Sequence, residues 1–384
     1  MLVNIRDILS NADKHKYAQG AFNVNAVAQV KAAVEVHELF RSPAILQGAN
    51  LANGFMGGRI DFPNSTIDDK KAGAKNIADA VKKYAENSPI PVALHLDHGS
   101  DFESCVAAIE GGYTSVMIDG SSLSFEDNVE LTREVVKYAH ARGVSVEGEL
   151  GVLAGVEDDV SSEESTYTNP LKAIEFFKKT GVDALAISYG TKHGPNKGKD
   201  TVIRKEIPIA IKECMLHEGI DGFLVSHGSS TVPQYIVEDI IKLGGKLSDM
   251  HGIAVDQLVE VSKGGINKIN VDTDIRLAVT RNMRELFKNK PQLQQSDTLK
   301  EVFALLNGDL SVTDPRAYLH PLMNTLMYGD IPNEDVKDVI EAVESGVKEV
   351  IGQLVVQFGS YGHASEIECH SLDEMADYYK KSEK

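Results

Sequence analysis

Short apolar runs recur along the chain, and most are apolar at consecutive positions rather than at alternate ones. A strand that is buried on both faces has this pattern, whereas a strand with one face in water alternates. The runs predict eight strands, at residues 20 to 25, 44 to 49, 91 to 99, 114 to 120, 144 to 151, 183 to 190, 222 to 228 and 266 to 274.

Segments with a helical period lie between these strands, including residues 26 to 40, 72 to 86, 128 to 143, 169 to 181 and 237 to 247. A helix between successive strands produces right-handed crossovers and a parallel sheet. Eight such units predict an α/β fold of the (β/α)8 TIM barrel type. An open doubly wound sheet is the alternative, but the first strand lacks the glycine-rich phosphate turn that is typical of that fold.

Helical segments continue beyond the eighth strand, around 275 to 306 and 333 to 357. A barrel of about 250 residues with insertions accounts for the length of the chain. We therefore predict a single barrel domain over residues 1–384, with extra C-terminal helices in an extension at about 296–360. The charged C-terminal tail at about 363–384 is expected to be peripheral or frayed.

Two unusual loops follow predicted strands. Residues 155 to 170 are acidic and rich in serine, directly after the fifth strand, on the face where barrel active sites form. This loop is either a lid or a solvated surface loop. The glycine- and asparagine-rich segment at 50 to 66 is a second candidate for covering the pocket.

Composition excludes several classes of partner. The chain has 39 Lys and Arg against 57 Asp and Glu, and a net charge of −18 opposes binding to nucleic acid or to an anionic membrane. Three cysteines without CxxC spacing indicate neither a disulfide framework nor a thiolate zinc site. No secretory leader and no run of about 20 apolar residues is present, so a cytoplasmic protein is expected.

Three histidines lie at the ends of separate predicted strands: His98, His193 and His227. One such histidine is usually a hydrogen-bonded structural residue. Three in the same topological position, one of them beside Asp97, predict a catalytic metal site, because catalytic zinc takes three protein ligands and keeps a fourth position open. Three histidines also accept cobalt, manganese or iron.

Several motifs occur in order along almost the whole chain. They are AFNVN, HLDHG, MIDGS, the ExELGxxAGxE pattern at 147 to 157, GTKHGPNK, SHGSS, NVDTDIRLA and DPRAYLHP. Together they resemble the class II, metal-dependent fructose-bisphosphate aldolases. The resemblance implies a zinc-dependent lyase of glycolysis and gluconeogenesis, which reversibly cleaves fructose 1,6-bisphosphate to dihydroxyacetone phosphate and glyceraldehyde 3-phosphate.

The resemblance also implies roles for individual residues. His98, His193 and His227 match the zinc ligands of the family. Glu149 and Asp119 match carboxylates that either form an alternative metal position or orient the histidines. Asp97 matches the residue that removes the C4 hydroxyl proton, and Glu157 matches the lid acid that protonates the enediolate.

The phosphate sites are implied in the same way. The C1 phosphate pocket is matched by Gly194, Lys197, Gly228, Ser230, Asp272 and Thr273. Arg276 matches the arginine for the distal phosphate, and Asn23 and Asn270 line the space between. Two alternatives remain: Lys197 as a solvated loop cation, and Arg276 as the partner of a local carboxylate.

Two departures from the family pattern leave the substrate open. Ala49 stands where the family usually has a serine, and Asn196 where an aromatic residue is common. Tagatose 1,6-bisphosphate or another phosphorylated ketose is therefore an alternative substrate. A zinc hydrolase on a barrel and a Schiff-base aldolase using Lys268 are more distant alternatives. The resemblance further implies a homo-oligomer, either a dimer or a tetramer, and a second divalent ion or a monovalent cation.

Overall fold

Eight parallel strands form a closed barrel in the computed structural model, which describes residues 2–153, 155–157, 160–162, 166–198 and 201–382. The strand order around the barrel is β1-β10-β9-β8-β5-β4-β3-β2. All eight predicted strands are confirmed: β1 (Gln19–Asn23), β2 (Ala44–Ala49), β3 (Val92–Gly99), β4 (Ser115–Ile118), β5 (Ser145–Leu150), β8 (Ala184–Ile187), β9 (Phe223–Ser226) and β10 (Ile266–Val271).

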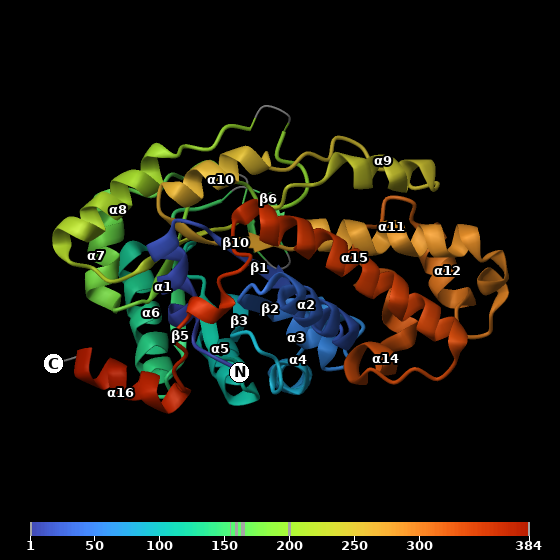
Figure 1. Ribbon diagram of the computed structural model, residues 1–384, viewed down its shortest axis with the longest axis horizontal. Coiled ribbons are helices and arrows are strands. Elements are labelled where there is room, and N and C mark those ends of the chain that lie inside the picture. The colour runs from blue at the N-terminus through green and yellow to red at the C-terminus, as the bar shows by residue number, and fades with distance from the viewer. Residues whose placement is uncertain (1, 154, 158–159, 163–165, 199–200, 383–384) are drawn as a thin grey trace.

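Helices separate the strands and surround the barrel (Figure 1), so the predicted TIM barrel with extra C-terminal helices is confirmed. The outer helices are α2 (Val27–Phe40), α4 (Ile67–Ala85), α5 (Phe102–Gly111), α6 (Phe125–His140), α7 (Pro170–Thr180), α8 (Glu206–Glu218), α9 (Gln234–Lys242), α10 (Val255–Lys263) and α11 (Thr273–Asn289). None of the described helices combines the length and the apolar character that a membrane span requires.

The barrel interior is apolar at one end and polar at the other. Helix α1 (Ile5–His15) closes the N-terminal end, where its Ile8 and Leu9 pack with Ala21, Ile45 and other apolar interior residues. Side chains two positions further along a strand point to the same face. Asn23 and Gln47, which follow Ala21 and Ile45 at this spacing, therefore enter the interior nearer the carboxyl ends of the strands, and the polar site is built there.

The segment 50 to 66, a candidate for covering the pocket, is partly helical and contacts the ends of β2 and β3. It contains helix α3 (Asn50–Met56) and a 3₁₀ turn (Phe62–Asn64), and α3 packs closely on α4. A Cβ atom on Gly73 of α4 would lie 1.7 Å from the carbonyl oxygen of Asn53. Gly57, within the segment itself, also permits this close helix contact, because a Cβ atom there would lie 2.1 Å from the carbonyl oxygen of Asp69 in α4.

The C-terminal helices gather with α11 on one side of the barrel (Figure 1). They are α12 (Lys300–Gly308), α13 (Arg316–Leu319), α14 (Met323–Tyr328) and α15 (Glu334–Phe358). The long helix α15 packs along both α2 and α11, with Val339, Val343, Val347 and Val350 among its buried side chains. These helices thus extend the outer layer of the barrel.

Of the two expectations for the tail, peripheral or frayed, the second is wrong for the described part of that segment. After a 3₁₀ turn (Ala364–Glu366), helix α16 (Leu372–Ser382) packs against α6. The Tyr379 ring stacks on His140 at a centroid distance of 3.6 Å, and its hydroxyl donates to Asp183 over 2.9 Å. Asn4 donates to the same hydroxyl over 3.1 Å, so the last helix is fastened beside the start of the first one.

Candidate metal centre and active site

The end of β3 brings two successive polar side chains into the barrel. Neighbouring residues of a regular strand point to opposite faces. Here the register of β3 against β4 shifts between Leu96 and Gly99, and His98 has a positive φ of 49°. This irregularity allows both Asp97 and His98 to be buried, with exposed fractions of 1% and 4%.

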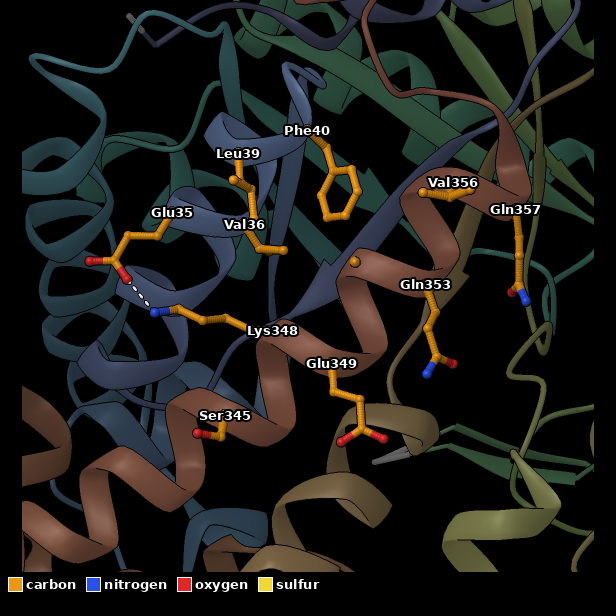
Figure 2. A pocket seen from close by; sticks show the side chains of 11 residues that line it. Glu35, Val36, Leu39, Phe40, Ser345, Lys348, Glu349, Gln353, Val356 and Gln357 are labelled. Carbon is orange, nitrogen blue, oxygen red and sulfur yellow. Dashed lines mark ion pairs between the residues drawn. The ribbon is translucent and has the colours of Figure 1, made fainter.

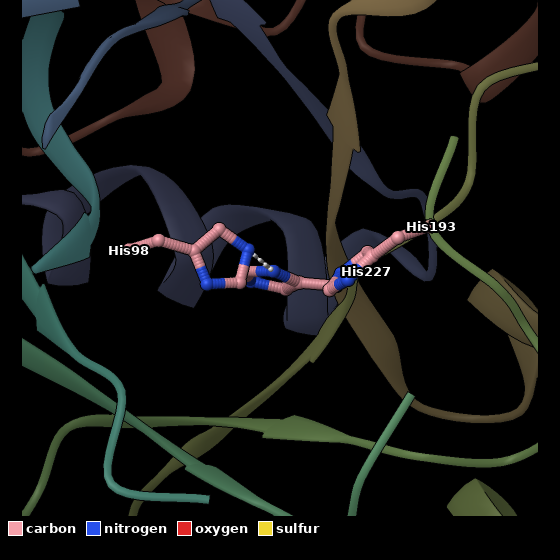
Figure 3. Close-up of side chains that lie close together, drawn as sticks. All are labelled: His98, His193 and His227. Carbon is pink, nitrogen blue, oxygen red and sulfur yellow. Dashed lines mark hydrogen bonds between the residues drawn. The ribbon is translucent and has the colours of Figure 1, made fainter. Parts of the chain in front are cut away.

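The three predicted histidine ligands converge from three strand ends (Figure 3). The ring of His98 lies 5.2 Å from that of His193 and 4.7 Å from that of His227, measured between centroids. Each ring offers one nitrogen atom, and these three atoms lie within 4.8 Å of one another. The structure therefore brings together the donor set that the sequence predicts.

Carboxylates fix the orientation of two of these rings. The Nε2–H of His227 donates to Glu147 over 2.7 Å, and the Nδ1–H of His98 donates to Asp119 over 3.0 Å. The remaining nitrogens, Nδ1 of His227 and Nε2 of His98, face each other at 3.0 Å. Two imidazole lone pairs in this position require a cation or a proton between them, so the residues present fit a zinc ion.

The pKa values of the histidines agree with a single positive charge at this point. Burial lowers the pKa of His98, but its hydrogen bond to Asp119 and the charges of nearby carboxylates outweigh this effect, and the pKa lies well above its ordinary value. Burial lowers the pKa of His193 and of His227 well below the ordinary value, and the charge on His98 adds to the effect. The site thus supports one cation and neutral neighbours.

Asp119 and Glu149 form a second group with His98, again with their ligand atoms within 4.8 Å. An oxygen of Glu149 lies 4.0 Å from Nδ1 of His98. Asp119 also accepts hydrogen bonds from the backbone and hydroxyl of Ser121, at 3.1 and 2.7 Å. Asp119 therefore orients His98, while the placement of Glu149 is compatible with an alternative metal position.

Asp97 is held by two amides. Asn23 donates to one carboxylate oxygen over 3.0 Å, and Asn270 donates to the other over 3.0 Å. Gln47 in turn donates to Asn23 over 2.7 Å. The carboxylate therefore has a fixed orientation beside the histidines, which a positioned general base requires.

Glu147 is a site residue that the sequence analysis did not identify. It is fully buried, accepts from Lys268 over 3.0 Å, and lies 3.4 Å from His95 in addition to its contact with His227. The available signal was its position two residues before Glu149, on the same face of β5. Lys268 also donates to Asn270 over 2.7 Å, so its ammonium group lies between two residues of the site.

The turns after β8 and β9 touch each other beside the histidines. Gly228 has φ of 59°, and a Cβ atom there would lie 2.4 Å from the carbonyl oxygen of Lys192. Lys197 is 3% exposed and donates to the carbonyl oxygens of Lys192 and Gly194, at 2.5 and 2.9 Å. The alternative of Lys197 as a solvated loop cation is therefore wrong.

The loop after β9 is shaped by Asp274, which the sequence analysis also missed. Its carboxylate accepts from the backbone N–H groups of Thr231 and Val232, each over 2.8 Å. The hydroxyl of the preceding Ser230 accepts from the backbone N–H of Asp272 over 3.4 Å. This arrangement leads directly into Thr273, the first residue of α11, and brings Ser230, Asp272 and Thr273 together.

Arg276 pairs with two carboxylates, Asp272 at 2.5 Å and Asp314 at 3.0 Å. Arg276 thus pairs with local carboxylates, which was the alternative to a role in binding the distal phosphate. Its side chain is 18% exposed, near the edge that Asp272 and Thr273 form.

The predicted lid contains a short hairpin of β6 (Gly155–Glu157) and β7 (Val160–Ser162). A Cβ atom on Gly155 would lie 2.3 Å from the carbonyl oxygen of His193, so the hairpin begins against a predicted ligand. Residues 158, 159 and 163–165, and the side chain of Glu157, lie outside the described part of the chain.

A wide groove of about 950 Å³ lies elsewhere, between α2 and α15 (Figure 2). None of the predicted site residues lines it. Lys348 and Glu35 pair across it at 2.5 Å, and Leu39 is 77% exposed beside it. This groove is therefore separate from the candidate active site.

Comparisons with known proteins agree with this geometry. The family model described as fructose-bisphosphate aldolase class-II matches residues 3–363. The chain is 40% identical over 341 residues to the fructose-bisphosphate aldolase of Treponema pallidum, covering 85% of this chain and 92% of that protein. It is 36% identical over 380 residues to that of Giardia intestinalis, covering 99% of each.

A solved structure shares the fold. The crystal structure of fructose-bisphosphate aldolase from Campylobacter jejuni matches with a TM-score of 0.66 at 20% identity, covering 94% of this chain and 96% of that chain.

Proposed function

Because the chain belongs to the class II fructose-bisphosphate aldolase family, we propose that it reversibly cleaves fructose 1,6-bisphosphate to dihydroxyacetone phosphate and glyceraldehyde 3-phosphate at the three-histidine site. The observation that carries the proposal is the convergence of His98, His193 and His227 beside the oriented carboxylate of Asp97. We propose zinc as the ion that these histidines hold.

His98, His193 and His227 would hold a zinc ion, and the bound ion would supply Lewis acidity toward the C2 carbonyl of the ketose. Asp97 removes the proton from the C4 hydroxyl, since its two amide partners hold it in one orientation. Glu157, on the hairpin that starts against His193, returns a proton to the three-carbon fragment. Glu147 and Asp119 keep two of the histidine rings in the ligating orientation.

The phosphate groups bind at the turns after β8, β9 and β10. Backbone N–H groups near Gly194, Gly228 and Ser230 suit the C1 phosphate, because glycine-containing turns let a phosphate approach the backbone closely. Lys197 adds positive charge there. Arg276 binds the distal phosphate by exchanging its contacts with Asp272 and Asp314 for the phosphate oxygens.

Tagatose 1,6-bisphosphate is retained as a second candidate substrate because of Ala49, which pairs with Asp97 across β2 and β3. The neighbouring Asn50 is 1% exposed and donates to Ser100 over 3.2 Å, so its amide is committed to a contact within the protein. Ala49, which lacks the serine hydroxyl of the family, therefore lies beside Asp97, the proposed base at C4. The two sugars differ in configuration at this carbon.

The test is a cleavage assay on both sugars, with and without EDTA and after addition of zinc. We expect zinc-restored release of triose phosphates, faster from fructose 1,6-bisphosphate. Faster cleavage of tagatose 1,6-bisphosphate would reassign the substrate. Activity that is insensitive to chelation would contradict the metal mechanism, and His98→Ala with full activity would do so as well.

We also propose that the chain forms a homo-oligomer, a dimer or a tetramer, in which the groove between α2 and α15 is a candidate contact surface. Leu39 and Val356 support this choice, since both line the groove and expose 77% and 48% of their surface. Light scattering on the purified protein gives the mass, and a single-chain mass at high concentration would contradict the proposal.

A further inference from the structure

We propose that His15, His363 and Glu366 form a second binding site, for a divalent transition metal ion, at the N-terminal end of the barrel. One ligand atom from each of these residues lies within 4.8 Å of the other two. Nε2 of His15 lies 3.5 Å from a Glu366 oxygen, and Nδ1 of His363 lies 2.6 Å from the same oxygen. The ligands come from the end of α1 and from the turn after α15.

The His363 ring is held by the surrounding structure. His363 stacks on Tyr17, with 4.6 Å between ring centroids and 16° between planes. The backbone on either side of His363 is fixed, because the N–H of Gly362 donates to Phe40 and that of Ala364 to Arg41, each over 2.9 Å. A solvated ion pair would not need this support, whereas a metal site depends on oriented ligands.

The Tyr17 ring that stacks on His363 is itself fixed in place. Tyr17 is 4% exposed, and its hydroxyl donates to Asn11 over 2.9 Å. Tyr17 therefore connects the His363 ring, on which it stacks, to Asn11 of α1. Contacts that hold the neighbours of a ligand fix the orientation of the ligand and raise metal affinity.

The donor set indicates the class of ion. Two imidazoles with one carboxylate suit zinc, cobalt, nickel or copper, whereas calcium and magnesium prefer oxygen ligands. The ion would replace the hydrogen shared by His363 and Glu366, and water would complete its coordination. The side chains of His15, His363 and Glu366 are 32%, 22% and 46% exposed, so an ion can reach them from solvent.

The position of the site predicts its effect. His15 ends the helix whose Ile5, Ile8 and Leu9 fill the N-terminal end of the barrel. An ion there would fasten this helix to the segment after α15, at the end of the barrel opposite the catalytic histidines. We therefore expect it to slow unfolding and raise the melting temperature, without changing turnover.

The experiment counts zinc ions on the purified protein by equilibrium dialysis at micromolar free zinc, in wild type and in the double variant His15→Gln/His363→Gln. We expect the double variant to bind one equivalent fewer, whatever number the wild type binds. His217→Gln is the matched control, since this histidine is 85% exposed and outside the cluster, and it should bind as the wild type does.

Equal zinc content in the double variant and the wild type would overturn the proposal. Glu366→Gln retains both rings and removes only the charged ligand. We expect it to lower the zinc affinity of this second site at least about 10-fold. This variant also provides the test if the double variant does not fold. The zinc-dependent rise in melting temperature should disappear in both variants and remain in His217→Gln.

Discussion

The Nε2–H of His227 donates to the fully buried carboxylate of Glu147 over 2.7 Å. This contact holds the ring so that its other nitrogen faces His98. Lys268 donates to the same carboxylate over 3.0 Å, so the orientation of the ring depends on a buried network rather than on one bond.

We expect Glu147→Gln to lower zinc affinity about 10- to 100-fold, the usual effect of removing a carboxylate that orients a histidine ligand. Competition with a chelator measures the affinity. Excess zinc should restore much of the activity, which a variant that only perturbs folding would not show. Glu344→Gln is the control, because this carboxylate pairs with Lys31 on the outer helices. A Glu147→Gln variant with wild-type zinc affinity would contradict the role.

Asp97→Ala is expected to retain zinc and to lose cleavage by about 10²-fold or more, since a positioned base contributes on this scale. Metal analysis and turnover on the same sample separate the two effects. If zinc content falls together with activity, Asp97 is a structural partner of the site. Asp97→Asn, which preserves size, distinguishes loss of the base from loss of packing.

Arg276→Ala should raise KM for the bisphosphate about 10- to 100-fold, because charge-assisted hydrogen bonds contribute about 1.5–3 kcal/mol. Substrate saturation curves measure this change. Arg281→Ala on the same helix is the control, since Arg281 pairs with Glu349. An unchanged KM in Arg276→Ala would leave this arginine with only its structural contacts to Asp272 and Asp314.

The pH dependence of stability should include a contribution from His37, whose pKa burial lowers to about 4. The unfolded chain binds this proton near pH 6.5, so the contribution is complete above that pH and is lost as the pH falls toward 4. This lowering of the pKa from 6.5 to about 4 corresponds to a contribution of about 3 kcal/mol to the free energy of unfolding, because a change of one in pKa is worth about 1.36 kcal/mol. Urea unfolding at several pH values should show a weaker pH dependence in His37→Gln, and parallel curves for both proteins would refute the assignment.

Tyr379→Phe should destabilise the protein by about 1.5–3 kcal/mol, because it removes a hydrogen bond to the buried carboxylate of Asp183. Burial raises the pKa of Asp183, but His140 and Arg6 outweigh this effect and the pKa is lowered, so the charged form is present at neutral pH. The control is Tyr378→Phe, whose side chain is 40% exposed, with an expected loss below about 1 kcal/mol. Equal losses of unfolding free energy in Tyr379→Phe and Tyr378→Phe would show that the Tyr379 hydroxyl does not anchor α16.

The barrel could be predicted because strands buried on both faces leave a distinct apolar signature, and because helices alternate with them. The three histidines were found for a related reason, since each lies at or shortly after the carboxyl end of such a strand. Asp97 and His98 are adjacent in the sequence, and only the irregular end of β3 explains how both enter the site.

Other features depend on partners that are distant in the sequence. Gly73 permits the close approach of α3, but in the sequence the glycines near residue 54 have the appearance of a loop. Glu147 gains its function from His227, and Asp274 from the turn at Thr231. The sequence of α16 is mostly charged and gives no sign that the helix is anchored. The anchor is the single residue Tyr379, which contacts His140 and Asp183.

The two amides that hold Asp97 come from β1 and β10, strands that become neighbours only at the seam where the barrel closes, with Ala21 opposite Asn270. The first strand cannot pair with the last one until the whole barrel sequence has been synthesised. In an open, partly assembled chain, Asp97 therefore has only one of its two amide donors. Catalytic activity is thus an indicator of ring closure. In a refolding experiment, its recovery should coincide with formation of this seam and lag behind the appearance of helical signal.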